Sequence, residues 1–233
     1  METVRAALGA RARPAEPLGR YTSFRIGGPA ELFVVPETTA DLQVVVRVCA
    51  AHGVRPVFLG GGSNVLVGDG GIPGVVVKLG RGFAALSWQE GEGGVVVRAG
   101  AAAQLGRLAR EAVARGLIGL EFAEGIPGTI GGALFMNAGA YGGDVAATVE
   151  AVEGLDAAGT RLELAGDALA FGYRRTALPA GFVVTAVRFG LRAGAREDVH
   201  ARTEEARERR LAAQPQGKAS AGSIFKYPAG DPA

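Results

Sequence analysis

The sequence predicts an α+β protein, on the strength of three observations. Short apolar runs bounded by glycine or proline have the length of strands. Three longer segments, residues 38–51, 101–115 and 196–213, have the residue pattern of helices. These helices do not alternate regularly with the strands, as they would in a doubly wound parallel sheet. The 38 glycines among 233 residues indicate many tight turns between these elements.

The first part of the chain is expected to form strand, helix, strand and loop. Residues 1–20 are rich in Ala, Arg and Pro, and the prolines would end any helix that begins there. A strand is expected over residues 30–35. A second strand over residues 56–59 leads into a glycine loop, and the apolar run at residues 65–67 is expected to form a third strand.

The helix predicted between these strands, residues 38–51, has clear end signals. Thr38 or Thr39 can cap its start, and Gly53 lies just past its end. One face is apolar and carries Leu42, Val45, Val46 and Cys49. This face is expected to pack against the strands.

The second part is predicted to be richer in strands. A helix over residues 101–115 ends at Gly116, and a charged helix covers residues 196–213. Residues 157–159 are expected to form a hairpin turn. The expected strands are residues 75–79, 95–98, 149–155, 160–164 and 182–191.

Composition excludes several classes of protein. Hydrophobic residues make up 48% and charged residues 21%, which is globular rather than disordered composition, and the glycines lack the period of collagen. A net charge of +2 gives no indication of nucleic acid or an anionic membrane as a partner. No run approaches the roughly 18 apolar residues of a membrane span, and the first residues lack the apolar core of a signal peptide. We expect a soluble, cytoplasmic protein. The sequence leaves its oligomeric state open, with a monomer as the preferred expectation.

The cysteine and histidine content excludes two kinds of site. Cys49 is the only cysteine, so no intrachain disulfide can form, which fits a reducing compartment. Together with His52 and His200 it forms no metal-ligand cluster, so no metal site is expected.

A glycine loop follows the second predicted strand. It consists of Gly60, Gly61, Gly62, Ser63 and Asn64. Successive glycines let backbone amides point into one concavity, which suits a phosphate or diphosphate group. The pattern matches neither a dinucleotide fingerprint nor a P-loop. Taken alone, a sharp turn between two strands is the favoured interpretation.

A second glycine segment changes that balance. Residues 126–132 read Ile-Pro-Gly-Thr-Ile-Gly-Gly and offer further free amides where a helix is expected to start. Two segments suited to anions in one small chain indicate a dinucleotide or another large cofactor.

Five motifs in this order resemble those of the UDP-N-acetylenolpyruvoylglucosamine reductases, the MurB flavoenzymes. They span residues 22 to 226, and each alone is short. Their sequences are Thr-Ser-Phe-Arg-Ile-Gly-Gly-Pro-Ala at 22–30, Gly-Gly-Gly-Ser-Asn at 60–64, Gly-Ile-Pro-Gly through Met-Asn-Ala-Gly-Ala-Tyr-Gly at 125–142, Phe-Gly-Tyr-Arg at 171–174 and Ser-Ala-Gly-Ser-Ile-Phe-Lys at 220–226.

This resemblance implies a two-lobed FAD-binding fold of the vanillyl-alcohol-oxidase (PCMH) type. Residues 18–73 would form the first FAD-binding subdomain and residues 74–193 the second. Residues 194–233 would begin a third, substrate-binding domain. FAD would be bound non-covalently, with NADPH as the hydride donor.

The resemblance also implies a reaction and its residues. UDP-N-acetylglucosamine enolpyruvate would be reduced to UDP-N-acetylmuramate, a precursor of peptidoglycan. Arg174 would stabilise negative charge that spreads onto the substrate carboxylate, and Ser223 would donate the proton. Tyr173 and Lys226 would bind substrate. Outside the motifs, Arg174 would be interpreted as a surface arginine and Ser223 as a turn serine.

The expected cofactor-binding residues combine the two glycine segments with their flanks. Arg210 resembles an arginine that lies near the flavin in the family, although a solvated helix charge would give the same pattern. The full set is Gly60, Gly61, Gly62, Ser63, Asn64, Gly125, Ile126, Pro127, Thr129, Gly132, Gly139, Ala140, Tyr141 and Arg210.

The sequence departs from the family at its end. The family continues well beyond the last motif and carries a catalytic glutamate there, to which no residue of this chain can be matched. We expect a C-terminally truncated chain that binds FAD but turns over weakly. It would be either a fragment of a longer gene product or a natural short form.

Two other functions remain open from the sequence. The first is a different FAD oxidoreductase on the same scaffold, such as a sugar or alcohol oxidase. Several of these attach flavin through a histidine, but neither His52 nor His200 lies in a glycine loop, so a covalent flavin is not expected. The second is an FAD-binding or regulatory module without turnover.

Overall fold

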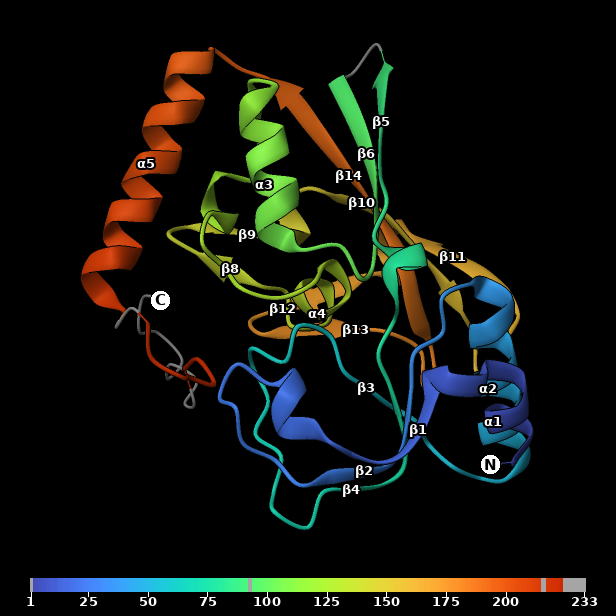
Figure 1. Ribbon diagram of the computed structural model, residues 1–233. Helices are drawn as coiled ribbons and strands as arrows, with labels where there is room; N and C mark the ends of the chain where they lie inside the picture. Colours follow the sequence, from blue (N-terminus) through green and yellow to red (C-terminus); the bar gives the residue numbers. More distant parts are fainter. Residues whose placement is uncertain (1, 92–93, 215–216, 224–233) are drawn as a thin grey trace.

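The computed structural model describes residues 2–91, 94–214 and 217–223. Two sheets with helices around them make up the molecule (Figure 1). The α+β prediction is confirmed. Four strands form the smaller sheet and six form the larger, and two separate two-stranded hairpins lie beside the larger sheet.

The smaller sheet has the strand order β1-β2-β4-β3. Strand β1 runs antiparallel to β2, whereas β2, β4 and β3 are parallel. The strands are β1 (Ala12–Pro17), β2 (Pro29–Val34), β3 (Val57–Phe58) and β4 (Ile72–Val77). Helices α1 (Glu2–Leu8) and α2 (Thr39–Ala51) lie together at one side of this sheet, and their buried residues share a cluster with its strands (Figure 1).

Helix α2 confirms its predicted end signals. Thr38 is the N-cap, and its side chain accepts from the amide of Asp41 at 3.1 Å while the Asp41 carboxylate accepts from the Thr38 amide at 3.0 Å. This reciprocal pair is a capping box, which satisfies two amides at the helix start. Gly53, just past the end, has the left-handed conformation with φ 66° that glycine tolerates.

The sequence did not predict β1, because Pro14 and Pro17 argue against a strand. The strand lies at the edge of the sheet and pairs only with β2. A proline at an edge costs little, since the side that lacks a donor can face away from the partner. The smaller sheet therefore begins before residue 18, the start that the sequence suggested for the first unit.

The third strand of this unit was placed wrongly. No strand covers residues 65–67, and the parallel partner of β2 is β4. The sequence analysis expected a separate strand over residues 75–79, whereas β4 begins at Ile72 and includes Pro73 and Gly74. The ladder accommodates both through a register shift between Ala30 and Leu32 of β2. A division at residues 73/74 would cut β4, so the sheet of the first unit extends to Val77.

The larger sheet is antiparallel throughout, with the order β11-β10-β14-β6-β5 and β7 paired to the end of β14. The strands predicted over residues 149–155 and 182–191 are confirmed as β10 and β14. The strands of this sheet are β5 (Leu86–Gly91), β6 (Gly94–Gly100), β7 (Leu117–Ile118), β10 (Val149–Leu155), β11 (Arg161–Ala165) and β14 (Val183–Ala193).

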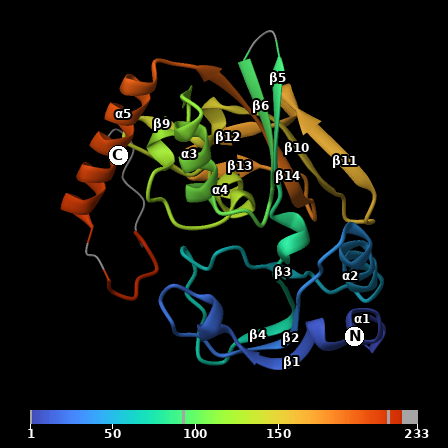
Figure 2. The ribbon, with the colours of Figure 1, turned by 45° about the horizontal axis from the view of Figure 1, so that its top comes forward.

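Helices and hairpins cover one face of this sheet (Figures 1 and 2). Their residues pack with inward residues of β6, β10 and β14 in the largest apolar cluster. The elements are α3 (Leu105–Ala114), α4 (Ile130–Phe135) and the hairpins β8 (Gly139–Ala140) with β9 (Gly143–Asp144) and β12 (Ala170–Gly172) with β13 (Arg175–Ala177). Helix α5 (Arg196–Ala213) lies outside them, against α3 and β7.

Helix α3 begins at Leu105, four residues later than predicted. The amides of Ala101 and Ala102 donate to the carbonyls of Thr185 and Phe83, so this stretch continues the strand contacts and cannot join the helix. Helix α5 has the bounds that the sequence predicted.

The two sheets share part of their core. Leu155 of β10 and Val183 of β14 belong to the cluster that contains the buried residues of α1 and α2. Gln43 of α2 also donates to the carbonyl of Gly159 at 2.9 Å, in the predicted hairpin turn between β10 and β11. Among the described helices, none is long and apolar enough to cross a membrane.

Candidate cofactor and substrate site

The glycine loop after β3 lies directly against the second glycine segment. A Cβ atom at Gly61 would lie 2.7 Å from the Cα of Gly128, and one at Gly60 would lie 2.6 Å from the Oγ1 of Thr129. The hydroxyl of Ser63 donates to the carbonyl of Pro127 at 3.2 Å. The two loops are more than 60 residues apart in sequence but pack directly against each other. Their backbones come so close that a Cβ atom would not fit, so the contact requires glycine.

The amides of the glycine loop have no acceptor in the described protein. None of the amides of residues 60–64 donates a hydrogen bond to a described residue, and the same holds for Gly128 and Thr129. Gly62 and Thr129 are buried whereas Gly61 and Asn64 are exposed, so an acceptor for these amides must come from water or from a ligand. Seven adjacent donors fit the oxygens of a diphosphate.

The prediction for the second segment was wrong in one respect. Helix α4 does start there, with Thr129 as its N-cap, but its first amides are already used. Those of Ile130 and Gly131 donate to the carbonyls of Ala103 and Ala101 at 2.9 Å, and that of Gly132 donates to the Thr129 hydroxyl. Residues 101–103, just before α3, pair with this segment. The contact is long-range, so no local sequence pattern predicts it.

Arg210, near the end of α5, reaches the same region. Its guanidinium lies 5.9 Å from the ring centre of Tyr141, and its Cδ is 2.6 Å from the position of a Cβ atom at Gly125. The Nη1 atom donates to Gln214, but the buried Nε makes no hydrogen bond to a described residue. A buried donor without an acceptor is again consistent with a ligand oxygen or ring nitrogen nearby.

The hairpin of β8 and β9 carries Gly139, Ala140 and Tyr141 next to the turn that carries Arg174. The Nη1 of Arg174 donates to the carbonyl of Gly139 at 3.1 Å. Tyr141 and Arg174 both have φ 54°, a left-handed conformation that is costly for residues with a Cβ. Such conformations concentrate at functional sites, where the surrounding structure enforces them.

Asn137 holds these two hairpins together, and the sequence analysis did not assign it to the site. It is buried and has φ 39°. Its side chain bonds to Asp144, to the carbonyl of Gly172 and to the amide of Ala146. The only sequence signal was its position inside the longest motif.

The last described segment lies against the glycine loop. Ser23 donates through its hydroxyl to the carbonyl of Ser220 at 2.6 Å, and a Cβ atom at Gly222 would lie 3.4 Å from the carbonyl oxygen of Ser63. Ser223 follows and is exposed, and Tyr173 is 48% exposed. Lys226 lies outside the described residues. Ile126 packs against the large apolar cluster.

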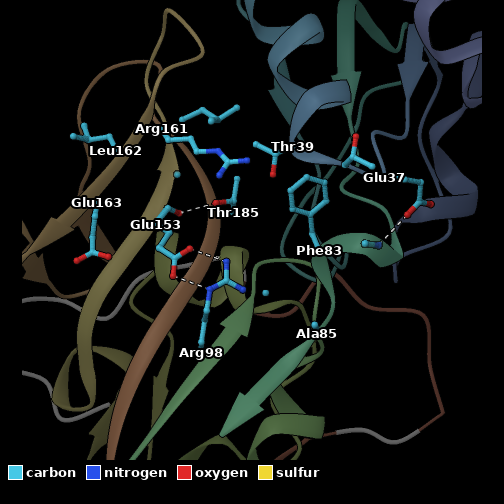
Figure 3. Close-up of a pocket in the computed structure, with 15 residues that line it drawn as sticks. Glu37, Thr39, Phe83, Ala85, Arg98, Glu153, Arg161, Leu162, Glu163 and Thr185 are labelled. Atoms are coloured by element: carbon cyan, nitrogen blue, oxygen red, sulfur yellow. Dashed lines mark hydrogen bonds and ion pairs between the residues drawn. The ribbon is translucent and has the colours of Figure 1, made fainter. Parts of the chain in front are cut away.

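The hollow shown in Figure 3, of about 440 Å³, is a different place. It lies on the opposite face of the larger sheet from α3 and α4, and no predicted site residue lines it. Arg98 and Glu153 form an ion pair there at 2.7 Å, and the hydrogen bonds from Arg98 lower the pKa of Glu153. Among the described residues, no group of His, Cys, Asp and Glu could hold a metal ion.

Comparison with known protein families gives a match to an FAD binding domain over residues 30–165. The UDP-N-acetylenolpyruvoylglucosamine reductase of Granulibacter bethesdensis is 44% identical over 228 residues, which cover 97% of this chain and 72% of the relative. That of Paracoccus denitrificans is 45% identical over 218 residues, covering 93% and 69%.

Comparison with solved structures agrees. The crystal structure of UDP-N-acetylenolpyruvylglucosamine reductase (MurB) from Thermus caldophilus superposes with a TM-score of 0.80 and 37% identity, covering 93% of this chain and 75% of that one. The glucose dehydrogenase Phl p 4.0202 shares the fold, with a TM-score of 0.60, 16% identity and coverage of 84% and 44%. The two-lobed FAD-binding fold expected from the motifs is therefore confirmed.

Proposed function

We propose that this chain, which belongs to the UDP-N-acetylenolpyruvoylglucosamine reductase family, binds FAD non-covalently in the cradle of residues 60–64 and 128–129. With NADPH as the hydride donor, it would serve the reduction of UDP-N-acetylglucosamine enolpyruvate to UDP-N-acetylmuramate. The observation that supports this most directly is the set of seven backbone amides without an acceptor among the described residues.

The cradle and its neighbours divide the work of holding the cofactor. The amides of residues 60–64 would bind the diphosphate, because they have no acceptor among the described residues. The absent Cβ atoms of Gly60, Gly61 and Gly62 let this loop pack closely against Thr129, Gly128 and Tyr21. Arg210 and Tyr141 would lie against the remainder of the cofactor, where the buried Nε of Arg210 offers a further donor. His52 ends α2 and His200 lies within α5, so neither histidine is in a glycine bend, which supports non-covalent binding.

When bound, FAD would supply the hydride transfer that links NADPH to the enolpyruvyl double bond. Arg174 would stabilise the charge that develops toward the substrate carboxylate, from a turn that the Gly139 carbonyl holds. Ser223 would deliver the proton to the adjacent carbon. Tyr173 and Lys226 would contact the substrate.

Turnover by this chain alone is expected to be weak. Ser223 is exposed, and Tyr173 is 48% exposed although the Arg174 guanidinium lies 5.3 Å from its ring centre. A reaction centre open to water weakens the electrostatic stabilisation that the arginine can give.

The visible spectrum of the purified protein tests this proposal. We expect a yellow protein whose colour passes into the small-molecule fraction on denaturation. NADPH should bleach it, and UDP-N-acetylglucosamine enolpyruvate should restore the colour slowly. A protein that shows no flavin binding on titration with FAD would overturn the proposal, and fast recolouring would overturn only the expectation of weak turnover. Binding without bleaching would favour a module without turnover.

A further inference from the structure

Lys78 is a partly buried lysine at the base of the glycine loop. It follows the last residue of β4, and its backbone amide donates to the carbonyl of Val34 at 2.9 Å, which fixes its main chain in the smaller sheet. Its ammonium donates to the carbonyl of Gly60 at 2.5 Å. The side chain thus contacts the first residue of the proposed diphosphate cradle.

This ammonium has no negative partner among the described residues. No ion pair joins Lys78 to a carboxylate there, although eight arginines of the described chain have one. Burial lowers the pKa of Lys78, because withdrawal from water disfavours the charged form. A lysine withdrawn from water usually has a compensating charge, so the missing anion is expected to come from a ligand.

The contact with Gly60 also orients the peptide that follows. In a trans peptide the N–H points away from the C=O, and no cis peptide occurs in the described chain. Because the ammonium holds the Gly60 carbonyl, the amide of Gly61 points to the opposite side. That amide is one of the donors without an acceptor, and the bond to a cation at the other end of the peptide strengthens it as a donor.

We propose that Lys78 is a positioning residue for the diphosphate of the bound dinucleotide, holding the Gly60–Gly61 peptide in its donor orientation and supplying the charge that balances the phosphates. This inference rests on the proposed binding of FAD in the same cradle. It predicts opposite effects on two quantities. The unpaired lysine lowers the stability of the protein without FAD, and it raises the affinity for FAD because its charge then faces the phosphates.

The test compares Lys78→Met with Lys78→Arg and with Arg81→Met, each measured for FAD affinity by flavin fluorescence and for thermal unfolding without FAD. Arg81 is exposed three residues further on, so its variant removes the same charge from the same end of the sheet. We expect Lys78→Met to weaken FAD binding at least about tenfold, as for loss of a charge-assisted hydrogen bond. Its melting temperature without FAD should equal or exceed that of the parent.

The controls separate charge from structure. Lys78→Arg should keep FAD affinity within about threefold of the parent, and Arg81→Met should leave it unchanged. Lys78→Met overturns the inference if it binds FAD as tightly as the parent. It also overturns it if it melts several degrees lower or fails to fold, because the lysine would then be a structural residue. If the parent chain does not bind FAD at all, the proposed function has failed before Lys78 is considered.

Discussion

The side-chain amide of Asn137 donates a hydrogen bond to the carboxylate of Asp144 at 3.0 Å. The same amide donates to the carbonyl of Gly172 at 3.2 Å, and its oxygen accepts from the amide of Ala146 at 3.0 Å. Asn137 is 5% exposed, so these bonds form away from water. They couple the hairpin of Gly139 and Tyr141 to the strand that leads into the turn of Arg174.

Replacing this amide by a carboxylate should be strongly destabilising. Asn137→Asp keeps the shape and tolerates the left-handed backbone, but it removes both donors and sets two carboxylates against each other. We expect a loss of about 3 kcal/mol in the free energy of unfolding, measured by urea denaturation. Adding Asp144→Asn restores one donor–acceptor pair and should recover part of the lost free energy of unfolding. A double variant no more stable than Asn137→Asp alone would show that the pair is not coupled.

The contact between the two glycine segments should control FAD affinity. An alanine Cβ at Gly61 would meet the Cα of Gly128 at 2.7 Å, so the segments must separate. Gly61 has no left-handed φ, and the effect therefore comes from the contact alone. We expect Gly61→Ala to weaken FAD binding at least about tenfold in a fluorescence titration. Gly68→Ala is the matched control, because a Cβ there meets nothing within 4 Å. If the two variants bound FAD with equal affinity, the contact between the glycine segments would not control FAD binding.

The pair of Arg11 and Asp41 predicts a defined loss of stability in acid. Arg11 donates to the Asp41 carboxylate at 2.5 Å and, with burial opposing it and backbone amides assisting, lowers the pKa of Asp41 to about 2. A carboxyl group whose pKa is lower in the folded state stabilises the fold above its unfolded pKa of 3.8, and this contribution disappears as the pH falls toward 2.

Comparison with Asp41→Asn measures this contribution. An asparagine can still accept from the capped amides, so the substitution removes charge but not the capping geometry. The difference in free energy of unfolding between the two proteins should shrink as the pH is lowered from about 5 to about 2. A difference that stays constant over this range would show that Arg11 does not stabilise the Asp41 carboxylate.

Cys49 should report unfolding of the smaller sheet. It is 1% exposed among the core residues of α2, and burial raises the pKa of its thiol, so both access and thiolate fraction are low. A chromogenic disulfide reagent should label it orders of magnitude more slowly in native protein than in denaturant. Since this is the only cysteine, the signal has one source. Complete labelling of native protein within the mixing time would contradict its burial.

Local patterns predicted the elements whose cause is local. Helix α2 has its cap and its terminal glycine in the sequence, and β10 and α5 have continuous patterns with clear ends. Strand β1 was missed since its two prolines are tolerated only at a sheet edge, and edge position is a tertiary property. The late start of α3 has the same origin, because the amides of residues 101 and 102 bond to the carbonyls of Thr185 and Phe83, which are distant in sequence.

The candidate site shows the same limit. The glycine segments could be found from the sequence because a close backbone approach requires that residue type. Their contact with each other, and the use of the α4 amides by residues 101 and 103, depend on how the sheets are placed. Lys78 gave no signal, since one lysine at the end of an apolar strand usually faces water. Asn137 was visible only as one letter of a motif.

Helix α2 is hydrogen-bonded to the turn between β10 and β11. Gln43 donates to the carbonyl of Gly159, and Arg47 donates to that of Ala158. Hairpin tips are ordinarily the places where epitope tags, fluorophores or new chain ends are tolerated. This tip instead bonds one lobe to the other, and an insertion there would break the hydrogen bonds from α2 and weaken the contact between the lobes. Labels and insertions should therefore be placed at other loops, so that the turn of Ala158 and Gly159 keeps its hydrogen bonds to α2.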